Sequence, residues 1–186
     1  MSELSAERLL TPEEYLSAER DGEVRHEYIG GLITAMAGAS RRHNIITGNL
    51  YADINRALRG TPCQSFVSDM KVRLALGRDE IFYYPDILVT CDSRDREHAD
   101  FVRYPKLIIE VLSPATERLD RREKFFAYLQ IPSLEEYVLI SQERPEALAF
   151  RAADNWTGVQ ITDTLELRSI GLPVPFADIF VGVEAE

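Results

Sequence analysis

Two acidic side chains stand in apolar runs of the sequence, where a charge is expensive to bury. Asp86 opens the apolar run 87–89, and Glu110 lies inside the run 107–112 with apolar residues on both sides. Both runs are typical of central strands of a sheet. An ionised carboxylate there is strongly destabilising unless a cation or a set of hydrogen bonds compensates for it. If the two strands are neighbours, Asp86 and Glu110 converge at one edge of the sheet.

Converging carboxylate oxygens are ligands that Mg²⁺ or Mn²⁺ accepts, with water and a substrate phosphate filling the remaining octahedral positions. A metal held in this way lowers the pKa of a bound water and stabilises charge on a reacting phosphate. Asp86 and Glu110 are therefore candidate metal ligands. Each also has a structural interpretation, because Asp86 can cap a turn after Pro85 and Glu110 can pair with a nearby Arg or Lys.

The segment after the second carboxylate is expected to be a helix from Thr116 to about Gln130. Asp120 and Lys124 are four residues apart and so share one face of this helix, and Tyr128 continues the row. A solvent-exposed salt bridge also explains the acid–base pair. The same segment carries a small basic patch, which either holds phosphates or is a solvated face: Arg118, Arg121 and Arg122.

The first third of the chain predicts two helices and a hairpin. The first helix is expected at 10–19, with Thr11 as N-cap and Glu14 completing a capping box. Apolar residues every fourth position predict an amphipathic helix at 43–59. Between them, a hairpin at 24–36 turns through adjacent glycines.

The remaining pattern predicts strands. Alternation around 70–74 indicates a half-buried strand with Lys71 on its polar face. A further strand is expected at 136–140, and the stretches 147–151 and 156–162 alternate as additional antiparallel strands. The economical architecture is one α/β domain with a mixed sheet, spanning 1–186 with an ordered core at about 10–180.

Composition limits the class of protein. An apolar fraction of 45% and an aromatic fraction of 9% are typical of soluble globular chains. The sequence contains neither an apolar run of transmembrane length nor a secretory leader, so we expect no membrane association and a cytoplasmic location. A net charge of -10, from 21 basic and 31 acidic side chains, argues against coating nucleic acid through bulk electrostatics. A nuclease needs only a local basic rim beside an acidic metal site.

The two cysteines are interpreted as structural. Cys63 and Cys91 are far apart in the sequence, have apolar surroundings and lack a CxxC pattern. We therefore expect reduced thiols in the core, without a chemical role.

The order and spacing of these motifs resemble a known family. The motifs are YPDILV at 84–89, LIIEVLSPAT at 107–116, then Asp120, Lys124 and Tyr128, and EYVL at 136–139, with TPEEY at 11–15 and YIGG at 28–31. The set is similar to the Uma-type family of restriction-endonuclease-like proteins, a member of the PD-(D/E)XK superfamily. The resemblance covers residues from about 10 to 180.

The resemblance implies a restriction-endonuclease-like core: a central mixed β-sheet flanked by helices, with additional antiparallel strands. It implies that Asp86 and Glu110 are metal ligands, with Glu27 as a further acidic member of the site. It also implies Mg²⁺-dependent cleavage of DNA, often by a homodimer. For Glu27, a cross-strand ion pair with an arginine is an equally good explanation.

One position departs from the superfamily pattern. A lysine normally stands two residues after the second acid, whereas this chain has Leu112, which cannot polarise water. The resemblance makes Lys124 the candidate replacement, oriented by Asp120, and Lys71 a weaker alternative. His43 shares the apolar face of its helix, so we interpret it as a packing residue rather than a ligand.

Two functions therefore compete. The leading prediction is a Mg²⁺- or Mn²⁺-dependent endonuclease that hydrolyses DNA phosphodiester bonds. The alternative is a catalytically inactive module that keeps the fold and binds nucleic acid or protein, which Leu112 and the acidic net charge favour. The sequence contains no separate DNA-reading element such as a zinc finger, so it predicts no sequence specificity.

Overall fold

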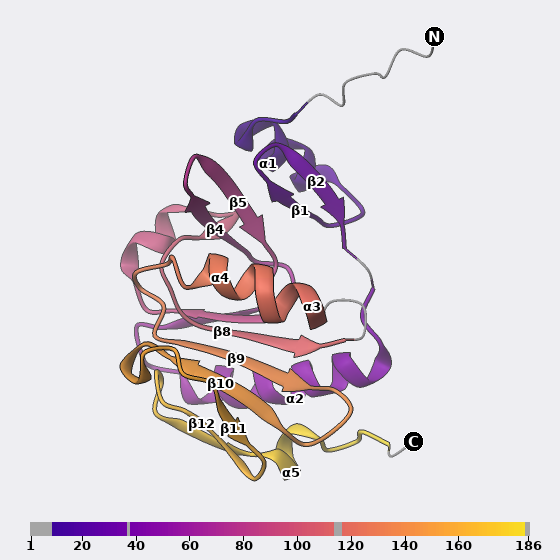
Figure 1. Ribbon diagram of the computed structural model, residues 1–186, viewed down its shortest axis with the longest axis vertical. Helices are drawn as coiled ribbons and strands as arrows, with labels where there is room; N and C mark the ends of the chain where they lie inside the picture. The colour runs from indigo at the N-terminus through magenta and orange to yellow at the C-terminus, as the bar shows by residue number, and fades with distance from the viewer. Residues whose placement is uncertain (1–8, 37, 114–116, 185–186) are drawn as a thin grey trace.

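The computed structural model describes residues 9–36, 38–113 and 117–184. Within these residues the strands form a six-stranded, a five-stranded and a two-stranded sheet (Figure 1). The architecture is mixed α/β, with central mixed sheets flanked by helices, which confirms the expected fold class.

The six-stranded sheet is the central layer of the molecule. In sheet order its strands are β11 (Val159–Ile161), β10 (Ala147–Arg151), β9 (Glu136–Ser141), β8 (Pro105–Leu112), β6 (Ile87–Thr90) and β3 (Gln64–Val67). The β8–β9 pair is parallel and the other pairs are antiparallel. All four residues of β6 are buried, as its continuous apolar sequence predicts for a strand covered on both faces.

Helices cover both faces of this sheet. Helix α2 (Arg41–Ala57) packs through Ile46, Leu50 and Ile54 on one face. The other face is covered by a helical segment that consists of α3 (Glu117–Leu119), the π-helical turn η2 (Asp120–Lys124) and α4 (Phe125–Tyr128). Alternate residues of β8 supply the two cores: Ile109 packs toward α2 and Ile108 toward α4.

The five-stranded sheet carries the amino-terminal elements. In sheet order its strands are β2 (Leu32–Ala35), β1 (His26–Ile29), β5 (Asp79–Tyr83), β4 (Lys71–Leu76) and β7 (Phe101–Val102). Helix α1 (Pro12–Asp21) begins with the predicted capping box and packs Tyr15 against Tyr28 and Phe82. The hairpin is confirmed, and Gly30 and Gly31 take positive φ values of 56° and 103° at its turn.

Short elements complete the described chain. They are the 3-10 helices η1 (Ser93–Glu97) and η3 (Ala152–Asp154), the two-stranded sheet of β12 (Thr164–Leu167) and β13 (Leu172–Pro175), and helix α5 (Phe176–Ile179). The sequence patterns did not predict the β12–β13 hairpin, because Pro173 and Pro175 lie in one of its strands. Prolines are tolerated there since each strand of a two-stranded sheet has an edge without partners.

Three local expectations need correction. The predicted helix 43–59 begins two residues earlier, at Arg41, after the N-cap Ser40. The predicted helix 116–130 contains the π-helical turn, and its proposed cap Thr116 lies outside the described residues. Lys71 is buried rather than on a solvent-exposed polar face. Its ammonium donates to the hydroxyl of Tyr84 at 3.2 Å, which compensates in part for the burial.

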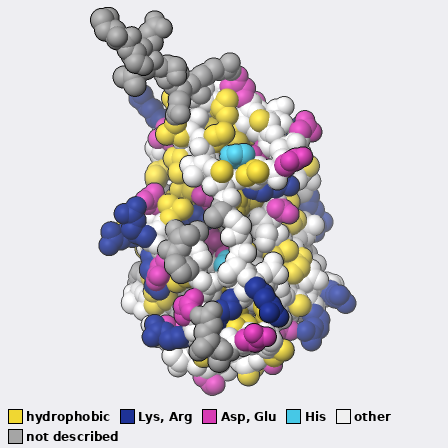
Figure 2. All heavy atoms as spheres, turned by 90° about the vertical axis from the view of Figure 1, so that its right-hand side faces the viewer, with side chains coloured by type: hydrophobic (Ala, Val, Ile, Leu, Met, Phe, Trp, Pro, Cys, Tyr) yellow, Lys and Arg dark blue, Asp and Glu magenta, His cyan; other side chains and the backbone are white. Residues whose placement is uncertain are grey.

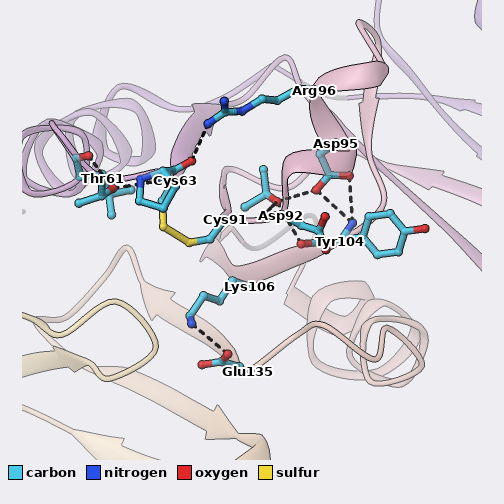
Figure 3. The surroundings of a disulfide bond; sticks show 12 residues. Thr61, Cys63, Cys91, Asp92, Asp95, Arg96, Tyr104, Lys106 and Glu135 are labelled. Atoms are coloured by element: carbon cyan, nitrogen blue, oxygen red, sulfur yellow. Dashed lines mark hydrogen bonds and ion pairs between the residues drawn. A yellow bond between two sulfur atoms is a disulfide. The ribbon is translucent and has the colours of Figure 1, made fainter.

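The expectation of reduced cysteines is also wrong, since Cys63 and Cys91 form a disulfide (Figure 3). Cys63 directly precedes β3 and Cys91 directly follows β6, and the antiparallel register pairs Gln64 with Thr90. The two cysteines therefore face each other across adjacent strands, with Cα atoms 4.0 Å apart. Because the two cysteines are far apart in the sequence, the sequence pattern did not indicate that they are neighbours in the fold.

Within the described parts of the chain, no helix combines the length and the apolar character that crossing a membrane requires.

The disulfide closes a loop with a sequence separation of 28 residues. Replacing both cysteines with serine is expected to lower the free energy of unfolding by about 3–4 kcal/mol, because the unfolded chain regains the entropy of the open loop. Urea unfolding of the wild type with and without dithiothreitol, beside the double variant, measures this change. A wild type whose unfolding midpoint does not respond to dithiothreitol would contradict the prediction.

Candidate active site

The two predicted carboxylates meet where β6 begins and β8 ends. The strands are antiparallel, and Ile87 pairs with Ile109, so Asp86 lies beside Glu110. The backbone N–H of Asp86 donates to Glu110 Oε2 at 3.2 Å, and Asp86 Oδ2 accepts from the backbone N–H of Val111 at 2.7 Å. Each carboxylate is therefore held by the backbone of the neighbouring strand.

A lysine from the helical segment lies against these carboxylates. Lys124 Nζ is 3.2 Å from Glu110 Oε1 and 3.0 Å from Glu27 Oε1, which β1 supplies. Asp120 Oδ1 is 3.4 Å from the same nitrogen. The four side chains are 3–11% exposed, which rules out a solvent-exposed salt bridge between Asp120 and Lys124. Leu112 packs in the apolar core, so the amine beside Glu110 comes from the helix rather than from β8.

The backbone of the helical segment is unusual at this point. Asp120 and Lys124 lie at the two ends of the π-helical turn η2. Such turns are rare in proteins overall, but those that occur are often found at functional sites. Tyr128, one turn later, donates its hydroxyl to Glu110 Oε1 at 3.1 Å. The hydroxyl of Tyr137 on β9 donates to the backbone oxygen of Asp120 at 3.0 Å. The two tyrosines attach this turn to the sheet.

His43 belongs to the site, although sequence reasoning assigned it to packing. Its Nε2 lies 3.0 Å from Asp86 Oδ2, and its side chain is 13% exposed. The signal was present in the sequence, since His43 is a polar residue on the helix face that Ile46 and Leu50 turn toward the sheet. A polar side chain at such a position needs a buried partner, and Asp86 is that partner.

The sequence left open the roles of Lys71 and of the basic patch in the helical segment. Lys71 contacts the hydroxyl of Tyr84, which in turn donates to Glu19 Oε1 at 2.9 Å, so Lys71 belongs to a separate buried cluster. In the predicted basic patch, Arg121 forms an exposed ion pair with Glu117 at 2.7 Å.

Burial and charge shift the protonation of the cluster. Burial raises the pKa of Glu110 well above its ordinary value, and the neighbouring Lys124 opposes this rise. Burial alone would lower the pKa of Lys124, but the carboxylates of Glu110, Glu27 and Asp120 outweigh it and hold this pKa above its ordinary value. Burial also disfavours protonated His43, yet the hydrogen bond and charge of Asp86 raise its pKa. The carboxylates thus favour the charged forms of Lys124 and His43, while burial disfavours the charged form of Glu110.

A cavity of about 490 Å³ opens onto the site. Figure 2, which faces the side where α2 begins, has acidic and histidine side-chain atoms in a recess near its middle. The lining of the cavity includes candidate catalytic residues. One wall is formed by residues of α2: His43, Asn44, Thr47 and Gly48.

The donor set suits a hard divalent cation. Among the described residues, no group of three or more Asp, Glu, His or Cys side chains is placed so that it could hold a metal ion, which excludes a cage of protein ligands alone. Mg²⁺ seldom needs such a cage, because one or two carboxylates, water and a substrate phosphate commonly complete its shell. The adjacent carboxylates of Asp86 and Glu110 fit this kind of site.

Comparisons with known proteins agree with the fold and motifs. Residues 12–177 match the model of the family Uma2, described as "Putative restriction endonuclease". The chain is 39% identical over 178 residues to the uncharacterized protein slr1290 of Synechocystis sp., covering 94% of this chain and 93% of that protein. It is 36% identical over 144 residues to sll1609 of the same organism, covering 76% and 80% of the two chains.

A solved structure has the same fold. It is the crystal structure of "a putative nuclease belonging to DUF820" from Anabaena variabilis, which superposes with a TM-score of 0.73 at 20% identity. The match covers 92% of this chain and 98% of that one. The family model spans nearly the whole described chain, and both curated relatives exceed 30% identity. The chain therefore belongs to the Uma2 family of restriction-endonuclease-like proteins.

Proposed function

We propose that this protein is a metal-dependent endonuclease that hydrolyses phosphodiester bonds of DNA. The observation that carries the proposal is the position of Lys124, whose ammonium lies 3.2 Å from Glu110 beside the paired carboxylate of Asp86. Two acids that can hold a cation, with an amine beside them, are groups that can support phosphodiester hydrolysis. The nuclease descriptions of the family and of the structural neighbour support the same chemistry.

In this proposal Asp86 and Glu110 hold Mg²⁺ or Mn²⁺ through their oxygens. When bound, the cation supplies charge to stabilise the reacting phosphate and acidifies a water. Lys124 replaces the lysine that is missing at Leu112, and it orients the attacking water or a phosphate oxygen through its N–H groups. Glu27 and Asp120 position Lys124 through ion pairs of 3.0 Å and 3.4 Å.

Two further residues orient the carboxylates. Tyr128 donates to Glu110 and limits its rotation, and His43 does the same for Asp86. Such partners fix the direction of metal ligands and typically change metal affinity or activity by about 10–100-fold.

The whole chain, residues 1–186, acts as one domain in this proposal. The family resemblance favours a homodimer, in which two copies carry one site each and cut opposite strands. No sequence specificity is part of the proposal.

An inactive binding module is the second candidate. The observation that favours it is the engagement of Lys124 by three carboxylates, which competes with any role toward water or phosphate. This candidate requires binding of nucleic acid or protein without turnover in any divalent metal.

Asp86→Asn and Glu110→Gln are each expected to lower nicking of supercoiled plasmid in Mg²⁺ or Mn²⁺ by more than about a hundredfold. The reason is that changing a metal ligand has a larger effect than removing a residue that only hydrogen-bonds to the ligand. Calorimetry should show that metal binding falls with the activity. Glu135→Gln is the matched control, because its carboxylate pairs with Lys106 at the surface. Metal-dependent nicking that survives in both site variants would refute the assignment.

Lys124→Met tests the charge balance of the cluster. Removing the ammonium leaves three buried carboxylates uncompensated, so the free energy of unfolding should fall by about 3–5 kcal/mol in EDTA. Adding Mg²⁺ should restore part of this loss and stabilise the variant more than the wild type, because a bound cation substitutes for the lost charge. Urea unfolding of both proteins in EDTA and in MgCl₂ measures the difference. An equal response of the two proteins to Mg²⁺ would argue against a cation site here.

A further inference from the structure

Strand β2 is an open edge of the five-stranded sheet, and every one of its residues is exposed. Its side chains are apolar apart from Thr34, and Leu32 and Ile33 are 55% and 46% exposed. The other edge strands of the two larger sheets, β7, β3 and β11, each contain buried or partly buried residues. Figure 2 shows hydrophobic side-chain atoms gathered in its upper part, at the height of the β1–β2 hairpin in Figure 1.

The outer backbone groups of β2 are available for pairing. The N–H of Met36 donates to the backbone oxygen of Arg25 at 2.8 Å, on the side of β1. Because the direction of these groups alternates along an antiparallel strand, Thr34 also bonds toward β1, while Ile33 and Ala35 direct their N–H and C=O groups out of the sheet. Among the residues that the structure describes, none bonds to these outward groups. Groups of this kind are a template for another strand.

The edge lacks the features that usually prevent such pairing. Natural proteins protect an exposed edge with charged side chains, proline or a β-bulge. The register of β2 with β1 is regular, and neither proline nor a charged residue occurs between Glu27 and Arg41. A net charge of -10 on each chain keeps copies apart except where a surface is free of charge. The segment around β2 is such a surface.

Strand β2 is also complementary to itself. When two copies lie antiparallel with a two-fold axis at Thr34, Ile33 of each copy faces Ala35 of the other, and the outward N–H and C=O groups of both residues are satisfied. On the other face of the strand, Thr34 meets Thr34, and Leu32 meets Met36. Threonine pairs and apolar pairs stabilise antiparallel strands. This register uses the whole strand and brings no charges together.

We propose that a second copy of this chain pairs with β2 edge to edge, so that the two five-stranded sheets join into one continuous sheet. Met36 lines the cavity of the candidate active site, so Leu32 of the second copy lies at the rim of that cavity. The inference rests on the proposed function and names the partner, and the contact with it, through which the same site acts on both strands of DNA.

The geometry of this dimer suits a duplex. Its two-fold axis is perpendicular to the sheet, so both active sites lie on the same face. Glu27 pairs with Thr34 on the neighbouring strand, which places the two Glu27 backbones three strand spacings apart, or roughly 14 Å. The major groove of DNA is about 12 Å wide. Two sites at this separation can reach the two strands of one duplex.

Sedimentation velocity tests the contact. Because the contact is smaller than most stable interfaces, the mass of the wild type should rise with concentration from 21.2 kDa toward twice that value. Ile33→Lys should raise the dimer Kd by more than about a hundredfold, since two lysines then approach each other across the axis. Val159→Lys is the matched control, because it changes an exposed apolar residue on the edge strand β11 and should dimerise like the wild type.

A second variant tests the backbone pairing. The N–H of Ala35 points away from β1, so Ala35→Pro removes no hydrogen bond within one chain but removes those donated between copies. It should also raise the dimer Kd by more than about tenfold. At concentrations where the wild type is a monomer, both variants should keep the wild-type Tm.

Hydrogen exchange locates the contact. In the wild type, the amides of Ile33 and Ala35 should become protected as the concentration rises, and in Ile33→Lys they should not. Protection that is the same at every concentration would mean that another segment of the same chain covers β2, and it would overturn the proposal. A dimer that leaves these amides unprotected would overturn it as well.

Plasmid cleavage separates this inference from the proposed function. Ile33→Lys should still nick supercoiled plasmid but form at least about tenfold less linear product, because the second site is no longer held near the first. A wild type that dimerises through β2 but cuts no DNA would uphold the contact and refute the nuclease. A wild type that nicks DNA but stays a monomer, or whose dimer survives both substitutions, would uphold the nuclease and refute the contact.

Discussion

The arrangement of this molecule depends on one buried ammonium group among three carboxylates. Glu27 comes from the five-stranded sheet, Glu110 from the six-stranded sheet, and Asp120 from the π-helical turn that also supplies Lys124. Desolvating one cation and three acids is strongly unfavourable unless all partners remain in place. The cluster therefore holds two sheets and a helical segment in a single relative position.

A nearby buried acid illustrates how a purely structural carboxylate differs. Glu136 is fully buried, and its Oε1 accepts from Arg151 at 2.7 Å while its Oε2 accepts from the backbone and hydroxyl of Ser169. There one acid meets one base, and hydrogen bonds satisfy the remaining oxygen. The cluster at Lys124 instead has three carboxylates around one ammonium group, an imbalance that is more frequent at functional sites than in structural ion pairs.

Local patterns were sufficient to predict the elements that carry the site, but not the β12–β13 hairpin or the contacts between distant strands. Asp86 and Glu110 could be singled out because a charge inside an apolar run is unusual, but it is the register of β6 and β8, with Ile87 opposite Ile109, that brings them together. The disulfide of Cys63 and Cys91 depends on the register of β3 and β6, which no local pattern encodes. The burial of Lys71 likewise depends on Tyr84, a partner 13 residues away. Tertiary pairing, rather than propensity, decided each of these cases.

The π-helical turn also constrains how the chain can change in evolution. In η2 the hydrogen bonds span five residues rather than four, so the turn accommodates one residue more than an α-helical turn. Deleting a residue would restore α-helical geometry and rotate the preceding part of the segment by about 100° relative to α4. Asp120 would then turn away from Lys124 while Tyr128 stayed in place. Insertions and deletions in this segment are therefore expected to disturb the Asp120–Lys124 contact more than most substitutions on its surface.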